Sequence, residues 1–143
     1  MRRALLWVVV ATEIGIAAEL ASQRHWDGAI QFIPWAALAV LAVGVVVAFR
    51  HNADRIARGC AIAVALTSGV GIFEHVSENL TAGPLDQKYA YTWSKMGAVH
   101  HVWLAVSGGV GPAPPLAAAS LAQAALLLLV ATWPRATVAP PTA

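Results

Sequence analysis

The feature that most constrains this chain is a run of 22 residues without a charge, from Gly28 to Phe49. A helix needs roughly 17–25 predominantly apolar residues to cross a bilayer. Three other segments have a similar character, and the four predicted spans cover about 4–22, 30–50, 56–77 and 115–133. Because every backbone polar group must be satisfied inside a membrane, we predict an all-α integral membrane protein with a four-transmembrane-helix bundle.

The composition supports a membrane protein and argues against several soluble classes. Of the 143 residues, 59% are hydrophobic and 11% are charged, against roughly 45–50% and about 25% in soluble domains. This balance excludes a typical nucleic-acid-binding protein and a disordered chain. The sequence holds one cysteine, Cys60, which we expect to be a small packing residue. It also lacks phosphate-loop, nucleophile-elbow and metalloprotease motifs, which favours a protein that is not an enzyme.

The basic residues predict how the spans are oriented. Six arginines fall on one side of the predicted membrane and three basic residues on the other; the first group is Arg2, Arg3, Arg50, Arg55, Arg58 and Arg135, and the second is Arg24, Lys88 and Lys95. The positive-inside rule then predicts a multi-pass protein of the cell (plasma or inner) membrane with both termini in the cytoplasm. The alternative that the first span is a cleaved signal peptide is disfavoured by Glu13 and Glu19 within it.

The second outer loop is long enough to carry structure of its own. It runs for 36 residues, 78–113, and its segment 92–107 places apolar and aromatic residues at helical spacing. We predict a short helix there, lying on the outer membrane surface or dipping into it. Asn79 begins a tripeptide that matches a glycosylation sequon, a pattern common by chance. Residues 1–133 form a single predicted domain, and 134–143 are expected to be a disordered tail.

Ionisable residues near the outer ends of the spans form the first candidate site. Glu74, His75 and Glu78 share one face of the third span. Glu19 of the first span is predicted to lie at the same depth, and loop histidines could close over the group. We call these residues the outer cluster: Glu19, Glu74, His75, Glu78, His100 and His101.

Deeper in the predicted membrane, Glu13 is a second candidate site. A charge at this depth is costly and is a functional candidate by default. The polar residues expected at the same depth are Thr67, Ser68 and Gln123, and we call these with Glu13 the deep layer. Glu13 could be neutral and hydrogen-bonded to one of them, or it could face a water-filled cavity.

Several functions are compatible with these residues. The favoured hypothesis is a structural or accessory subunit of a membrane assembly, embedded in the lipid bilayer and forming a homodimer or a larger complex. In an alternative, His75, Glu74 and Glu78 bind metal, with zinc, iron or copper suited to carboxylate and imidazole ligands. Haem is less favoured, since its histidine pairs usually sit deeper. Proton-coupled transport or relay through Glu13, and acid–base catalysis by a Glu/His pair, are further alternatives.

Overall fold

The computed structural model describes residues 1–50 and 53–134, all of whose regular elements are helices. The predicted tail 134–143 therefore lies outside the described residues except for Pro134. Four helices are long and apolar enough to cross a membrane, as predicted. The helices of the chain are α1 (Arg2–Ser22), α2 (Phe32–Phe49) preceded by the 3-10 turn η1 (Ala29–Gln31), α3 (Asp54–Ala82), η2 (Gly83–Leu85), η3 (Trp93–Lys95), α4 (Ala98–Val106) and α5 (Pro115–Thr132).

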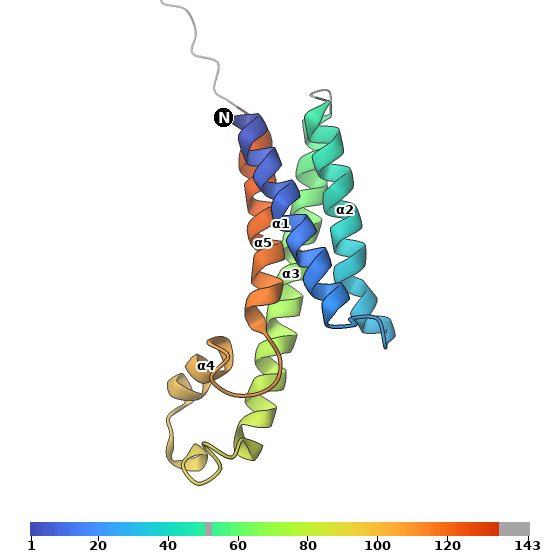
Figure 1. Ribbon diagram of the computed structural model, residues 1–143. Coiled ribbons are helices and arrows are strands. Elements are labelled where there is room, and N and C mark those ends of the chain that lie inside the picture. Colours follow the sequence, from blue (N-terminus) through green and yellow to red (C-terminus); the bar gives the residue numbers. More distant parts are fainter. Residues whose placement is uncertain (51–52, 135–143) are drawn as a thin grey trace, which may run out of the picture.

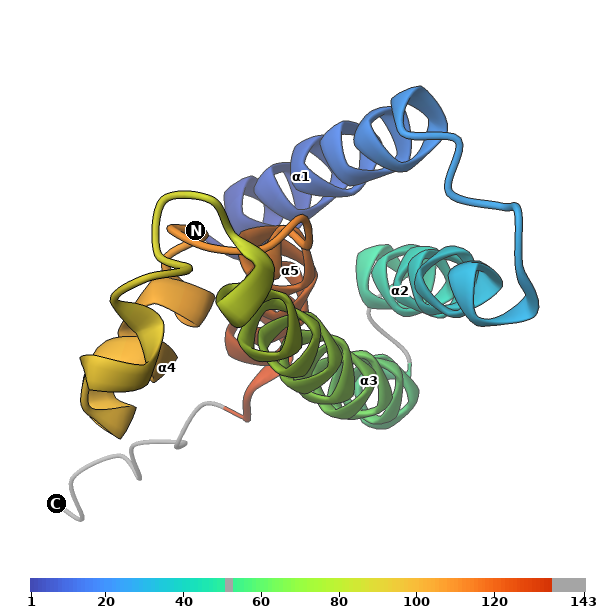
Figure 2. The same ribbon diagram turned by 90° about the horizontal axis from the view of Figure 1, so that it is seen from below.

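The four long helices form a bundle in which α5 lies between α1 and α3, while α2 packs against α3 and α1 (Figures 1 and 2). Leucine, valine and alanine side chains from all four helices make one core. The helices approach one another closely at Gly44 of α2. A Cβ atom there would lie 2.9 Å from both Cys60 Cβ of α3 and Leu128 Cδ2 of α5. Gly44 therefore lets three helices meet, and Cys60 has the packing environment expected of it.

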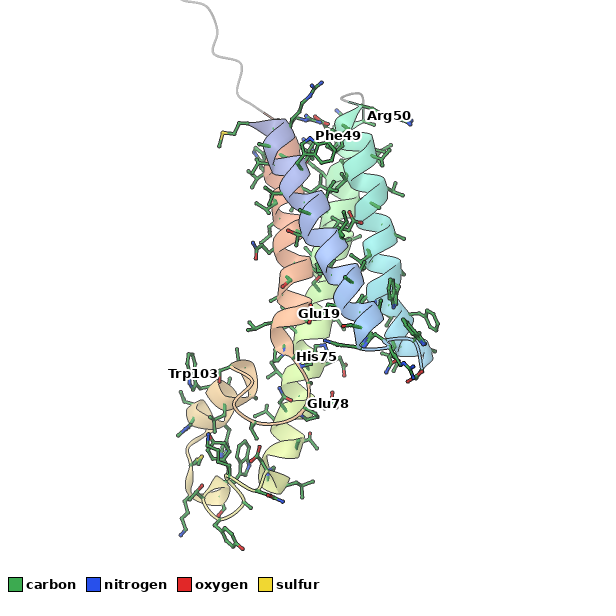
Figure 3. All side chains as sticks on the ribbon, in the orientation of Figure 1. Glu19, Phe49, Arg50, His75, Glu78 and Trp103 are labelled. Carbon is green, nitrogen blue, oxygen red and sulfur yellow. The ribbon has the colours of Figure 1, made fainter. Side chains whose placement is uncertain are left out.

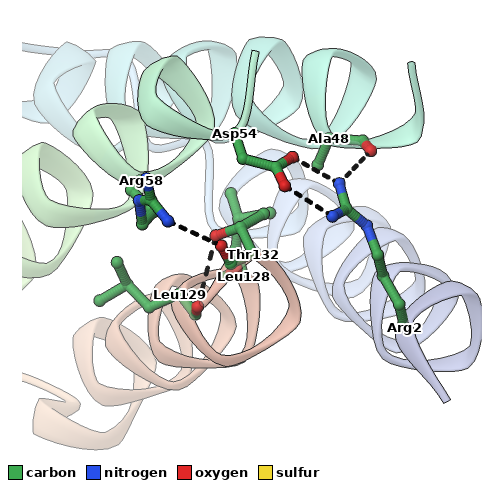
Figure 4. A network of polar contacts seen from close by, with 7 residues as sticks. All are labelled: Arg2, Ala48, Asp54, Arg58, Leu128, Leu129 and Thr132. Carbon is green, nitrogen blue, oxygen red and sulfur yellow. Dashed lines mark hydrogen bonds and ion pairs between the residues drawn. The ribbon is translucent and has the colours of Figure 1, made fainter. Parts of the chain in front are cut away.

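Polar contacts join the helix ends at one end of the bundle, which we call the arginine end (Figure 4). The Arg2 guanidinium donates two hydrogen bonds of 2.7 and 2.6 Å to the Asp54 carboxylate and a third to the Ala48 carbonyl oxygen. Arg58 donates to the Thr132 carbonyl oxygen at 3.0 Å. These contacts satisfy carbonyl groups that the ends of α2 and α5 leave without helical partners. They tie all four long helices together at the arginine end.

At the opposite end, which we call the loop end, α3 continues beyond the rest of the bundle (Figure 1). It ends at Ala82 instead of near the predicted residue 77. The extra turns persist because they have a partner: Val76 and Leu80 pack against a small second core of Leu104, Ala105 and Val110. We call residues 76–113 the loop-end unit. Local periodicity could not predict the longer helix, because the packing partner is about 25 residues away in the sequence.

Within the predicted helical segment 92–107, the structure has η3 and α4, separated at Met96 and Gly97, whose backbones are extended. This break between η3 and α4 allows the rings of Trp93 and His101 to stack, with ring centroids 4.1 Å apart. His101 Nε2 also lies 2.9 Å from the Trp93 carbonyl oxygen. Gly83 makes room for the indole, because a Cβ atom at Gly83 would overlap the Trp93 ring. The aromatic stack thus fixes how the loop folds back on α3.

Candidate functional site

The residues of the outer cluster lie on three helices. Helix α1 carries Glu19, α4 carries the two loop histidines, and the other members lie on α3. Glu74 and Glu78 are exposed, and His75 is half-buried on the same helix. Glu19 is exposed and accepts a hydrogen bond of 3.2 Å from Gln23 Nε2 of its own helix. Figure 3 shows Glu19 and His75 at similar heights along the bundle. In Figure 2, however, the carboxyl end of α1 lies away from α3 and is joined to α2 by the connecting loop.

The two loop histidines have different surroundings. His100 is exposed, whereas His101 is half-buried in the stack with Trp93. Within residues 1–50 and 53–134, no group of three His, Cys, Asp or Glu side chains could hold a metal ion. The structure therefore gives no support to the metal hypothesis for His75, Glu74 and Glu78. Equal depth in two helices does not bring side chains together when the helices diverge, and the sequence carries no direct signal of their crossing angle.

Glu13 lies in a groove between α1 and α2. It falls on the same helical face as the buried residues Val9 and Ile16. An open cavity of about 330 Å³ lies beside it. Only α1 and α2 line this cavity, and its other lining residues are apolar: Val10, Ile14, Ala17, Trp35, Leu38, Ala39 and Ala42. Glu13 is thus the single acidic group of an apolar groove.

No hydrogen bond in the described part of the chain reaches the Glu13 carboxyl group. Among the side chains that line the groove, the Trp35 indole N–H is a candidate donor, but it donates to the His25 carbonyl oxygen at 2.8 Å. Thr12, beside Glu13 on α1, donates to the Val8 carbonyl oxygen. Among the described residues, the Glu13 carboxyl group therefore has no hydrogen-bonding partner.

The other members of the deep layer bond within their own helices or are exposed. Thr67 Oγ1 donates to the Ala63 carbonyl oxygen at 3.0 Å, and buried Ser68 Oγ donates to that of Val64 at 2.8 Å. Gln123 is exposed on α5. None of these three side chains hydrogen-bonds Glu13 or lines its groove, which is formed by residues of α1 and α2.

Sequence reasoning missed the role of Asn79. Its side chain is fully buried, and its Nδ2 donates to the carbonyl oxygens of Ala105 at 3.0 Å and Ala113 at 2.8 Å. Its Oδ1 accepts a hydrogen bond of 3.0 Å from the Ala113 N–H. The sequon match drew attention to the residue, but an amide whose hydrogens are both donated inside the fold is not open to glycosylation.

Comparison with known proteins adds no family to this description. No protein-family model, no curated protein and no solved structure matches the chain. The site and its function are therefore argued from the residues and their geometry.

Proposed function

We propose that this protein is a multi-pass subunit of a larger assembly in the cell membrane, with a structural or accessory role. The four helices of the bundle span the bilayer, and both termini lie in the cytoplasm. The arginines gathered at the arginine end support this orientation, since cytoplasmic ends of spans carry an excess of Lys and Arg. The loop end then faces outward.

The orientation predicts which cysteines an impermeant reagent can label. In a Cys60→Ala background, Ser94→Cys lies at the loop end and Pro134→Cys at the arginine end, and both parent residues are exposed. An impermeant maleimide should label Ser94→Cys in intact cells and Pro134→Cys only after permeabilisation. The opposite pattern would reverse the topology.

The observation that carries the subunit proposal is the unpaired Glu13 in an open apolar groove. A carboxyl group at mid-membrane is expensive unless it is neutral and hydrogen-bonded or paired. The described chain offers it no donor, and the groove opens on the side of the bundle where lipid or another protein must cover it. A donor from outside the chain would satisfy the group.

The groove has the shape and lining that suit a transmembrane helix of a partner. Its α1 side runs from Val10 to Ala17, about 10 Å at 1.5 Å per residue. Three of its lining residues are alanines, and small residues allow helix backbones to approach closely in membranes. The partner helix would present a hydroxyl, amide, imidazole or cationic group at the depth of Glu13. A hydrogen bond of this kind contributes about 1–2 kcal/mol in model membrane helices.

Removing the Glu13 carboxyl group is expected to weaken the assembly and not the chain itself. Glu13→Leu should leave the thermal stability of the purified protein within a few degrees of the parent, because no internal contact is lost. In native membranes, the same variant should migrate in blue-native electrophoresis at the size of the isolated chain. Glu13→Gln, which keeps an acceptor and similar size, should retain much of the large species.

The matched control is Gln123→Leu, which also replaces a polar side chain at comparable depth but on an exposed face of α5. It should leave the assembly unchanged. Loss of folding in purified Glu13→Leu would contradict the proposal by assigning Glu13 an internal role. An unchanged assembly would also contradict it, since the groove would then not be the contact surface. If the assembly contains only this chain, the occupant is a second copy and the subunit is part of a homo-oligomer.

A further inference from the structure

One face of α4 is apolar and exposed. Val99 is 85% exposed, Val102 47%, Trp103 67% and Val106 40%. At about 100° per residue, these four positions fall within an arc of about 100°. They form a continuous stripe, which we call the α4 stripe, and Figure 3 shows Trp103 at the outer side of the loop-end unit.

The opposite face of α4 fixes which way the stripe points. Leu104 and Ala105 are buried in the second core, and His101 is held by Trp93. These three positions lie on the far side of the helix from the stripe. The stripe therefore faces away from α3 and cannot turn inward without breaking the second core and the Trp93–His101 stack.

The clasp at Asn79 sets the level of α4 relative to the bundle. The same amide binds the carbonyl oxygens of Ala105 in α4 and of Ala113, two residues before α5 begins at Pro115. Helix α5 has 18 residues and so measures about 27 Å. This length is slightly less than the thickness of the hydrocarbon layer, about 30 Å, so a spanning α5 must have Pro115 near the edge of that layer. The Ala105 end of α4 lies within a few residues' length of that edge.

We propose that α4 is an interfacial helix, whose stripe of Val99, Val102, Trp103 and Val106 packs into the headgroup and upper acyl region of the outer leaflet. This proposal rests on the membrane insertion proposed above. The headgroup regions together add about 10–15 Å to the bilayer, or about 5–8 Å on each side, which is comparable to the roughly 5–10 Å depth to which an interfacial helix buries its apolar face. A helix with one apolar face lies stably at this depth, and tryptophan is favoured there.

The geometry favours lipid as the molecule that covers the α4 stripe. The stripe lies at about the same depth as the start of α5, whose outer surface faces lipid. Leu116, in the first turn of α5, is itself 68% exposed. A soluble partner would have to bind a surface at the membrane edge. Lys88 and Lys95 of the same unit are exposed and add attraction to anionic headgroups.

Spin labels at single cysteines test the proposal in the full chain. In a Cys60→Ala background reconstituted into phosphatidylcholine–phosphatidylglycerol vesicles, labels are placed at Val99 and Val102 of the stripe. The control position is Tyr91, which is 89% exposed but lies outside α4, in the turn between η2 and η3. Collision with oxygen, relative to collision with a water-soluble nickel chelate, should be several-fold greater at Val99 and Val102 than at Tyr91.

A label at Leu126, which is 56% exposed on α5, separates failure of this proposal from failure of membrane insertion. Oxygen-rich collision at Leu126 together with chelate-rich collision at Val102 would overturn the interfacial placement and leave the four spans intact. Water-like collision at Leu126 would overturn both proposals. Protection of Val102 from both reagents would also overturn this one, because the stripe would then be covered by protein.

Discussion

Asn79→Asp is expected to release the loop-end unit from the end of α5. The substitution keeps the size of the side chain but removes the two N–H donors that bind the Ala105 and Ala113 carbonyl oxygens. Each carbonyl left buried without a partner costs about 1–3 kcal/mol. A carboxylate would also lie beside two carbonyl dipoles of the same sign. We therefore expect the free energy of opening of this unit to fall by about 2–6 kcal/mol.

Hydrogen–deuterium exchange measures this effect locally. Amides of α4 and of residues 110–113 should exchange at least about thirtyfold faster in Asn79→Asp, because 1.4 kcal/mol corresponds to a factor of ten. Amides in the middle of α2 and α5 should keep their protection. Gln87→Glu makes the same change from amide to acid at an exposed position of the same unit and should exchange as the parent does.

Gly111→Ala provides an independent test of the same contact. Gly111 has a φ of +78°, and a Cβ atom there would overlap Oδ1 of Asn79. Left-handed backbone at this position also disfavours any residue with a side chain. The variant should increase the exchange rate of the same amides as Asn79→Asp does. Unchanged exchange in both variants would show that the Asn79 clasp does not hold the unit closed.

The second large effect is expected from Gly44→Leu, which should separate α2 from α3 and α5. Even a Cβ atom at this position meets Cys60 and Leu128 at 2.9 Å. The Cys60 Cβ atom cannot move without its helix, and the Leu128 side chain is fully buried, so it can move only by repacking its neighbours. Overpacking of a tight core costs about 1–3 kcal/mol and sometimes more. A residue with three further heavy atoms should lie at the upper end of that range.

Thermal unfolding in detergent, followed by circular dichroism or a thiol-reactive dye at Cys60, measures the loss. Gly44→Leu should lower the midpoint by many degrees and make Cys60 react faster at low temperature. Gly69→Leu is the matched control, because Gly69 is also helical and a Cβ there meets nothing within 4 Å. Equal midpoints for the two variants would contradict the close approach of the three helices at Gly44.

The number and approximate limits of the four long helices followed from the sequence. The number of apolar residues in a span is set by the 1.5 Å rise per residue and by the thickness of the bilayer. The positions of the spans can therefore be found from the hydrophobic residues along the chain. The charge-free run ending at Phe49 and the proline-bounded start of α5 were recognised for this reason. The grouping of arginines at one end could also be predicted, because it follows from their positions in the sequence relative to the spans.

Lateral position could not be obtained in the same way. Depth along a helix can be counted from residue numbers, and Figure 3 places Glu19 and His75 at similar heights. Whether two side chains at one depth meet depends on helix neighbours and crossing angles, which arise from packing of the whole core. Packing of this kind places Glu13 in a groove with Trp35 and Leu38 of α2, a neighbourhood that counting residues along the chain could not predict.

Long-range polar contacts were likewise decided only by the tertiary structure. Asn79 and Ala113 are 34 residues apart, and Arg2 and Asp54 are 52 apart. Nothing in the local sequence distinguishes Asn79 from any polar residue near a helix end. Its role depends on two carbonyl groups, which the folding of α4 and the turn before α5 bring to its side chain. The sequence by itself determined which segments are helical and apolar, through short-range periodicity and length. The fold decided which polar groups are clasped, which are solvated and which, like Glu13, lie in an open groove.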